Sequence, residues 1–504
     1  MEPKLFFWID SHFVHYFLAK SIQEKINCKI YSCFEITDKP KKYFEKQKLV
    51  GFEKFWFFFD HIKKSNEKPD MEYLKNFETK YKIDLWLLAF NDRFFYKYNE
   101  YYTFSTQEKL KILEQECKFF EKIIDDVKPD FLISFSTHQQ QNDLFYRICK
   151  VKKIKILLFT PTHVGNAWAI TDDYDKFEPF DTTYFETKNL EKIEDYKQYL
   201  EEKDKYRTPN IIKSKYQQSK IDYLKAALNY LFSENSNVKT HFTYYGRNKL
   251  KVIQKMISYE LKRKSRKNFM DKNLGKEINF NEPFIYFPLH QEIERNLLLG
   301  APFHLNQVEM IRQIAQSLPI GHKLLVKDHT VMQSRGWRKI SQMKEIMEMA
   351  NVKLVHPEMN SYDIFPKCSL VITIGGTASI EAAFFNKPSI SFREVGHIKL
   401  PSINVVKNPH ELPTAIKTSL NEVVNPDDVS KFLTIIHHNS INFDFFGLMT
   451  DFMKEFNFGG FLADTELPEK EMKIFFEDNK DKFDFLALEH IKRIHKISED
   501  AKYV

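Results

Sequence analysis

The chain has 504 residues, more than one ordinary hydrophobic core can use, so we expect two or three domains. It is 43% hydrophobic, with 48 Phe and 24 Tyr, and its charged residues are mixed in sign, which excludes a chain that is disordered throughout. The net charge of +7 is modest for this length. It argues against a nucleic-acid partner and favours an anionic small ligand or a membrane surface.

The cysteines and the apolar runs narrow the cellular setting. None of the five cysteines stands in CxxC spacing, so we expect reduced thiols rather than a zinc or dithiol site. No apolar run reaches the ~18–20 residues that span a bilayer, and the run that opens the chain ends at Asp10. These features predict a cytoplasmic protein, with peripheral contact at the cytoplasmic face of the membrane as a further option.

The first part of the chain alternates apolar strands with helices. Strands are predicted at 5–9, 29–34, 131–135 and 154–160, helices at 12–25 and 139–150, and a mainly helical, aromatic-rich stretch at 50–127. Such alternation is typical of βαβ units and a parallel sheet. We therefore predict a Rossmann-like domain over 1–185, with its ligand edge at the carboxyl ends of the strands.

Residues 186–280 differ in character and predict a charged helical insertion or linker. The segment Lys262-Arg-Lys-Ser-Arg-Lys267 is a compact basic cluster within it. Such a cluster is most often a solvated helix face, and the alternative is contact with anionic lipid or with an acceptor.

A second α/β pattern covers 281–410. Strands are predicted at 284–287, 322–326, 352–355, 370–374 and 389–392, and helices at 307–318 and 377–385. We predict a second Rossmann-like domain here, followed by a helical tail over 411–504 that packs back on the N-terminal domain. The expected fold class is α/β with two doubly wound domains.

The most informative motif lies in residues 372–382. An apolar strand ends in Gly375-Gly376, and a helix begins with Thr377 and contains Ser379 and Glu381. Glycines admit close approach of a ligand, and a helix N-terminus offers unpaired N–H groups to a phosphate. The plain alternative is a tight turn in which Thr377 is a simple N-cap.

Two further motifs follow predicted strands of the same domain. Residues 325–330 place Lys327 and His329 at a strand end, where together they can neutralise a diphosphate. Residues 287–294 place His290 and Glu294 in the loop that leaves the first strand, within reach of a sugar or its phosphates. For each, an ordinary structural role is the alternative.

Together these motifs resemble the capsule polysaccharide biosynthesis family, which belongs to the two-Rossmann-domain (GT-B) glycosyltransferases. The family's Pro-Leu-His strand end, its following Glu and a downstream Gln correspond to Pro288, Leu289, His290, Glu294 and Gln307. Its Val-Lys-Glu-His-Pro segment corresponds to Val326, Lys327, Asp328, His329 and Thr330. Its Gly-Thr-Ala, Glu-Ala and Lys-Pro positions correspond to Gly376, Thr377, Ala378, Glu381, Ala382, Lys387 and Pro388. The resemblance covers about 283–392.

The resemblance implies transfer of a sugar from a nucleotide-sugar donor to a surface polysaccharide or lipid-linked glycan. Lys327, His329, Thr377 and Ser379 would face the phosphates, with Glu381 toward the ribose. No cofactor beyond the nucleotide sugar is expected, and no metal, since no Asp-x-Asp pair stands near the phosphate motifs. Thr330 departs from the family's Pro, and the first half of the chain carries no family motif.

The catalytic base has to come from a strand end of the first domain. Asp10 and His138 are the first candidates, followed by His12 and His163, because a His or Asp there can deprotonate an acceptor hydroxyl. Three other functions stay open: a sugar-nucleotide epimerase, a polyol-phosphate transferase, and a non-catalytic glycan-binding or export protein of the same fold.

Overall fold

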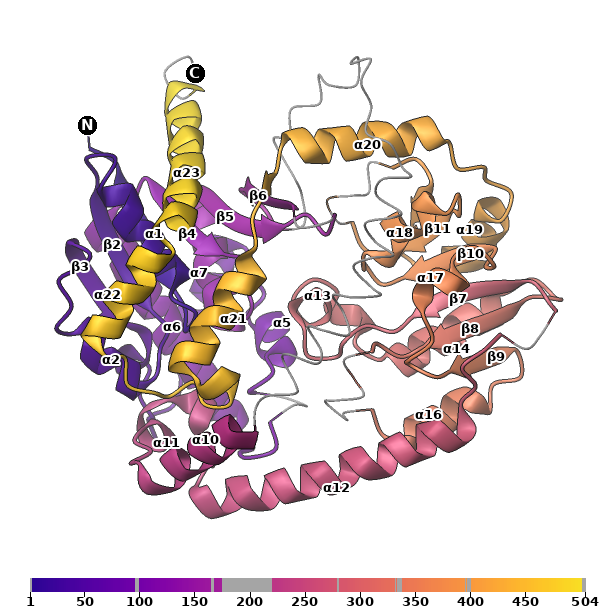
Figure 1. The fold of residues 1–504 in the computed structure, drawn as a ribbon, viewed down its shortest axis with the longest axis horizontal. Coiled ribbons are helices and arrows are strands. Elements are labelled where there is room, and N and C mark those ends of the chain that lie inside the picture. The colour runs from indigo at the N-terminus through magenta and orange to yellow at the C-terminus, as the bar shows by residue number, and fades with distance from the viewer. Residues whose placement is uncertain are drawn as a thin grey trace.

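The computed structural model describes residues 2–95, 99–164, 167–174, 220–278, 281–330, 332, 338–394, 396 and 400–500. These residues form two α/β units, each built on a largely parallel sheet, and the long helix α12 (Lys249–Asn273) runs along one side of both (Figure 1). The predicted fold class, α/β with two doubly wound sheets, is confirmed.

The first sheet has the strand order β13-β6-β5-β4-β1-β2-β3. Its parallel strands are β1 (Lys4–Ile9), β2 (Lys29–Phe34), β3 (Phe52–Phe57), β4 (Phe131–Phe135) and β5 (Lys155–Pro161). Two strands extend the sheet beyond β5. Strand β6 (Ala167–Thr171) pairs antiparallel with β5, and β13 (Ile441–Asn442) pairs antiparallel with β6. The chain reverses direction across the sheet between β1 and β4, the place where ligands bind in doubly wound folds.

Strand β3 corrects the prediction of a mainly helical stretch at 50–127. Its sequence Phe52-Glu-Lys-Phe-Trp-Phe57 puts aromatic side chains on both faces of an edge strand, so the alternation that marks a strand is hidden. The rest of the stretch is mostly helical, with α3 (Phe58–His61), α4 (Met71–Tyr81), α5 (Leu85–Asn91) and α6 (Thr106–Val127).

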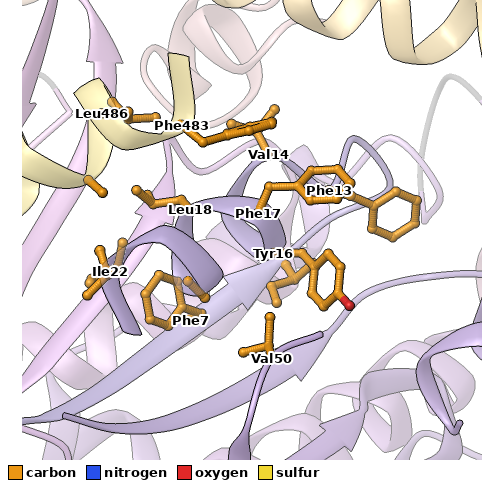
Figure 2. Close-up of a cluster of buried hydrophobic side chains, with 14 of the residues drawn as sticks. Phe7, Phe13, Val14, Tyr16, Phe17, Leu18, Ile22, Val50, Phe483 and Leu486 are labelled. Carbon is orange, nitrogen blue, oxygen red and sulfur yellow. The ribbon is translucent and has the colours of Figure 1, made fainter. Parts of the chain in front are cut away.

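Helices cover both faces of the first sheet. Helices α4, α6 and α7 (Gln140–Val151) lie over one face. The other is covered by α1 (Val14–Gln23) together with α21 (Phe445–Phe456), α22 (Glu469–Asp478) and α23 (Lys480–Asp500). In this layer Phe17 packs on Phe483 with ring centroids 5.0 Å apart, beside Val14 and Leu486 (Figure 2). The last helices of the chain therefore complete the core of the first unit (Figure 1).

The second sheet has the order β12-β11-β10-β7-β8-β9, and every strand in it is parallel. The strands are β7 (Phe284–Pro288), β8 (Lys323–Lys327), β9 (Val352–Val355), β10 (Leu370–Thr373), β11 (Ser389–Ser391) and β12 (Ile403–Val405). Its covering helices include α14 (Gln307–Ser317), α16 (Ile340–Met347), α18 (Ala378–Phe384), α19 (Leu412–Ser419) and α20 (Pro426–His438). Here the order reverses between β7 and β10.

The segment between the two sheets is helical where it is described. Helix α10 (Lys220–Phe232) precedes the short α11 (Asn237–Thr240) and the long α12. The part of the predicted insertion at 186–219 lies outside the described residues. No helix among the described residues combines the length and the apolar content that a bilayer crossing requires.

Candidate active site

The two positions at which the strand order reverses carry the residues that the sequence singled out. Asp10 follows β1 and His138 follows β4, while His290 follows β7 and the Gly375-Gly376 pair follows β10. We call the carboxyl ends of β1, β2 and β4 the first edge, and those of β7, β8 and β10 the second edge. Ligands of open α/β sheets bind at such edges.

At the second edge, His290 is held by four hydrogen bonds. Its backbone N–H donates to Gln307 Oε1 at 2.7 Å, and Gln307 Nε2 donates back to its carbonyl at 3.0 Å. Its Nε2 lies 3.0 Å from Thr373 Oγ1 and accepts the Ile374 N–H at 3.3 Å. Burial, with the charges of His329 and Arg393, lowers the pKa of His290 to about 3. His290 is therefore a neutral imidazole that fixes the β10 turn.

Side chains of the protein fill the space above both glycines. A Cβ on Gly376 would lie 2.7 Å from His290 Cε1, and a Cβ on Gly375, whose φ is +144°, would lie 2.4 Å from the Arg393 side chain. The glycines are thus required by His290 and Arg393 themselves, a reason that the motif alone did not reveal.

The hydroxyl groups that follow the glycines face two ways. Thr377 Oγ1 donates to Glu381 Oε1 at 2.8 Å, and both side chains are half-buried. Ser379 is fully buried, and its Oγ donates to the Gly376 carbonyl at 3.0 Å. The spacing explains this, because i and i+4 share a helix face while i+2 points away. Thr377 and Glu381 are therefore partly open to solvent, and Ser379 supports the turn.

The two candidate residues at the carboxyl end of β8 also differ in exposure. His329 is exposed, whereas Lys327 is buried and its Nζ donates to the Met359 carbonyl at 2.9 Å. Between them, Asp328 forms a bidentate ion pair with Arg338, at 2.8 Å to Nε and 3.2 Å to Nη2. Arg338 is 2% exposed.

A second acidic residue completes this buried ion cluster. Arg338 Nη1 donates to Glu292 Oε1 at 3.1 Å, which ties the β7 loop to the β8 loop. Sequence reasoning selected Glu294 in this loop, but Glu294 is exposed at the N-cap of α13 (Arg295–Leu298). Glu292 and Arg338 were missed because nothing in their local sequence distinguishes them from surface charges.

At the first edge, Asp10 is half-buried and pairs with His12. The His12 N–H donates to Asp10 Oδ1 at 3.0 Å, and His12 Nδ1 lies 3.4 Å from Oδ2. Burial favours a raised pKa, but the charges and hydrogen bonds of His12, with the charge of His15, outweigh it, so the pKa of Asp10 is lowered. Phe13, next in the turn, is held at φ 58°, a left-handed conformation that costs energy for a residue with a side chain.

Glu35 is the residue that sequence reasoning missed at this edge. It directly follows β2, accepts Trp8 Nε1–H at 3.0 Å and Gln141 Nε2–H at 2.7 Å, and lies close enough to Asp10 and Arg93 to feel both charges. Burial, reinforced by Asp10, raises the pKa of Glu35 to about 7. The sequence pattern that selected Asp10 would also have selected Glu35, because each is the first acidic residue after an apolar strand.

His138 lies at the first edge as predicted from its place after a strand. Arg93 Nη2 donates to its carbonyl at 2.8 Å, and its ring packs on Phe135 with centroids 4.8 Å apart. Burial lowers the pKa of His138 to about 3, so the imidazole is neutral and a weak base at pH 7. His163 lies in the turn after β5, with a left-handed φ of 63°. Strand β4 separates β5 from β1, so this turn is one strand further from Asp10 than His138 is.

Helix α13 joins the two edges. Arg295, on this helix of the second unit, donates through Nε to Thr137 Oγ1 at 3.1 Å, and its Nη2 lies 4.0 Å from Asp143. The next residue, Asn296, accepts a hydrogen bond from Arg393 Nη1 at its carbonyl, at 3.0 Å. A chain of contacts therefore runs from the Gly375 turn through Arg393 and α13 to the residue before His138, and two guanidinium groups lie along it.

A cavity of about 760 Å³ adjoins this bridge. It lies between α5 of the first unit and residues 298–306 of the second, with Asp92, the neighbour of Arg93, and Leu298 of α13 in its wall. Three exposed aromatic side chains line it: Trp86, Phe90 and Phe303. Its lining also includes the polar residues Asp84, Asn91, Asn306 and Gln342. Among the described residues there is no group of three or more His, Cys, Asp or Glu side chains that could hold a metal ion.

Comparison with known sequences bears on the second unit. The sequence profile of the family described as "Capsule polysaccharide biosynthesis protein" matches residues 190–394, which confirms the resemblance predicted from the three motifs. A comparison with curated proteins finds no similar sequence.

Similar solved structures are distant. UDP-GlcNAc 2-epimerase from Methanocaldococcus jannaschii is 12% identical over 87% of this chain and 100% of its own, with a TM-score of 0.24. UDP-GlcNAc 2-epimerase from Neisseria meningitidis, bound to UDP-GlcNAc, is 12% identical over 86% and 98%, with a TM-score of 0.27. The beta Kdo 2,7 transferase KpsC from Thermosulfurimonas dismutans is 12% identical over 62% and 79%, with a TM-score of 0.30. Likenesses at this level say nothing of activity.

Proposed function

Since residues 190–394 match the capsule polysaccharide biosynthesis family, we propose that the chain is a glycosyltransferase that moves a sugar from a nucleotide-sugar donor to a surface polysaccharide or lipid-linked glycan. The observation that carries the proposal is the pairing of two edges through α13: a carboxylate cluster on the first and a family-matched loop cluster on the second. The junction of two domains is a preferred place for ligand sites, and there an enzyme can bring two substrates together.

On the second edge the donor nucleotide meets His329, Thr377 and Glu381. These side chains are exposed or half-buried, and Glu381 carries the carboxylate that a ribose hydroxyl can donate to. Lys327, Ser379 and His290 act one layer below, because each is bonded to backbone groups that shape the loops. Glu294, exposed at the start of α13, stays a candidate contact for the sugar.

On the first edge Glu35 is the base, in place of Asp10 and His138, the first candidates from the sequence. The acceptor hydroxyl oxygen attacks the anomeric carbon, its proton passes to the Glu35 carboxylate, and the bond from that carbon to the phosphate oxygen breaks, so the nucleotide leaves with the electron pair. A base with a pKa near the working pH is best suited to this step, and the pKa of Glu35 is about 7. Asp10, which stays ionised, stabilises the positive charge that develops on the sugar ring.

The leaving diphosphate is stabilised by Arg295 and Arg393, without a metal. Both guanidinium groups are largely buried and lie on the bridge between the edges, where their charge is weakly screened. Turnover measured with excess EDTA should equal turnover without it. A loss that added Mg²⁺ or Mn²⁺ restores would contradict metal independence.

The cavity at α5 suits the acceptor glycan. Trp86, Phe90 and Phe303 offer apolar faces on which sugar rings stack, and the amide and carboxylate groups of the lining can bond the sugar hydroxyls. Trp86→Ala should raise the KM for the acceptor about tenfold while leaving donor affinity unchanged. Equal KM values in the two proteins would place the acceptor elsewhere.

A thermal-shift screen against CMP, CDP, UDP, GDP and dTDP tests the donor site. One nucleotide should raise the Tm, since a ligand that binds only the native state stabilises it. The shift should be lost in His329→Ala and Glu381→Ala and kept in His410→Ala, an exposed histidine of the turn before α19. No shift with any nucleotide would overturn the proposal. Conversion of the donor without any acceptor would instead indicate an epimerase.

A further inference from the structure

Two helices of the connecting segment carry apolar side chains on their outer faces. On α10 these are Ile221, Leu224, Leu228, Leu231 and Phe232, and on α12 they are Leu250, Ile253, Ile257 and Leu261. The spacing of three and four places each set in a stripe along its helix. Helices of globular proteins normally turn such a stripe inward, so these stripes call for a partner.

At the start of α12, its contacts with the first unit lie away from the apolar stripe. Near its start, Lys251 Nζ donates to the Tyr101 carbonyl and Lys255 pairs with Glu100 at 3.7 Å, both on the opposite face of the helix. Near its end, Met270 is buried and Asp271 lies 3.1 Å from His356 Nε2. The helix is thus anchored to the first unit at one end and to the second at the other.

The two stripes meet at one edge of the molecule. Lys249 Nζ donates to the Leu231 carbonyl at 2.6 Å, which brings the end of α10 to the start of α12. Phe232 and Leu250, 84% and 82% exposed, lie on the two sides of this junction. Both helices border the lower side of the molecule in Figure 1, where α12 passes beneath both units.

The charge of α12 identifies the kind of partner. The helix carries nine Lys and Arg but only Glu260 and Asp271 as acidic residues, so its formal charge equals the +7 of the whole chain. Its cations concentrate just after the apolar stripe, in Lys262–Lys267, and within the described residues Lys262, Lys264 and Lys267 form no ion pair. A second copy of the chain would oppose one such helix to another, and like charges would repel.

We propose that the stripes of α10 and α12, together with the basic cluster Lys262–Lys267, form a docking surface for an anionic lipid bilayer. The apolar side chains enter the boundary between head groups and acyl chains, and the lysines pair with anionic head groups. Helix α12 then lies parallel to the membrane, and both units stand on the same side of it.

Vesicle co-sedimentation of the full chain tests the surface. We expect binding to vesicles of equimolar phosphatidylcholine and phosphatidylglycerol, weakened by added salt, and little binding to pure phosphatidylcholine. The variant Lys264→Gln, Lys267→Gln should bind roughly 25-fold more weakly, at about fivefold for each cation. The pair Ile257→Ser, Leu261→Ser should lose about tenfold or more.

The control is the pair Ile320→Ser, Val423→Ser, which removes two apolar side chains from other surfaces, where they are even more exposed than Ile257 and Leu261. It should bind vesicles as the wild type does, and every variant should keep its Tm because the altered side chains are exposed. No binding to anionic vesicles, or equal binding by all variants, would overturn the proposal. So would a stable dimer in light scattering that the Ile257→Ser, Leu261→Ser pair dissociates, because a second copy would then cover the stripe.

Discussion

The first and second edges hold their polar side chains in opposite ways. At the first edge, acidic and imidazole groups lie among aromatic side chains, and burial moves the pKa values of Glu35 and His138 far from their ordinary values. At the second edge, His290, Lys327 and Ser379 bond to backbone groups, whereas His329 is exposed and Thr377 and Glu381 are half-buried. Displaced pKa values are typical of groups that transfer protons, so under the proposed function the first edge would carry the proton transfer and the second would hold the donor.

This difference explains why the second edge alone carries a family motif. Backbone turns that shape a loop need particular residues at fixed spacing, so they leave a local pattern in the sequence. A carboxyl group with a displaced pKa needs only burial and a neighbouring charge, and these come from segments far apart in the chain: Trp8, Arg93 and Gln141 around Glu35.

The largest effect is expected for Glu35→Gln, which removes the proposed base. Turnover should be measured with a sugar donor that carries the nucleotide found in the thermal-shift screen. It should fall about 10³-fold, within the usual range for general-base catalysis. In the wild type, activity should rise with pH through about 7 as Glu35 ionises, and this limb should vanish in the variant. If the pH profile of Glu35→Gln equals that of the wild type, Glu35 is not the base and the proposed contrast between the two edges is wrong.

Glu116→Gln is the matched control on the same face of the first sheet. Glu116 is fully buried and accepts Gln140 Nε2–H at 2.6 Å, and burial raises its pKa well above the ordinary value, which favours the neutral carboxyl group over the carboxylate. An amide replaces a neutral carboxyl group with little change in shape or charge. Turnover should therefore change less than about threefold, since neither substrate nor proton transfer involves it.

The second prediction concerns the ion cluster that braces the second edge. Asp328→Ala leaves the buried Arg338 with fewer anionic partners, and breaking a buried ion pair costs about 3–5 kcal/mol. Urea unfolding should show this loss, and nucleotide binding should weaken with it. Glu345→Ala removes an exposed partner of Arg312 and should cost less than about 1 kcal/mol. Equal losses would mean that Asp328 does not brace the loop.

Much of this arrangement could be predicted from the sequence, and the remainder depended on tertiary contacts. Strand ends after apolar runs located Asp10, His138, His290 and the Gly375-Gly376 turn, because parallel strands align their carboxyl ends. Helix periodicity would also have turned Ser379 away from Thr377 and Glu381. Glu292 and Arg338 lie 46 positions apart and become a pair only through the fold. The edge strand β3 stayed hidden because its aromatic side chains mask the alternation.

The third prediction uses a buried histidine that lies away from both edges. His490 on α23 is fully buried against the first sheet, and burial lowers its pKa to about 3. Because the folded pKa lies below the unfolded value, the unfolded state binds the proton first. The stability that neutral His490 contributes is complete above pH 6.5 and is lost as the pH falls toward 3.

His490→Met should therefore flatten the acid side of the stability curve. Between pH 7.5 and 4.5 the variant should gain about 2–3 kcal/mol relative to the wild type, as measured by urea unfolding at each pH. His410→Met, at an exposed position, should follow the wild-type curve. Parallel curves for His490→Met and wild type would show that water reaches this histidine in the folded state.

The smallest effect is expected for Gly376→Ala, which asks whether the second edge is as tightly held as its hydrogen bonds indicate. The new Cβ would meet His290 Cε1 at 2.7 Å, so the imidazole has to move and its bonds to Thr373 and Ile374 lengthen. We expect a loss of about 1–2 kcal/mol in stability and a similar loss in nucleotide affinity. Gly275→Ala should change neither, because its Cβ would lie at an ordinary contact distance of 3.7 Å from the Glu277 carbonyl oxygen. If Gly376→Ala binds nucleotide as the wild type does, the β10 turn can shift to accommodate a side chain, and the second edge is then no more rigid than the loops around it.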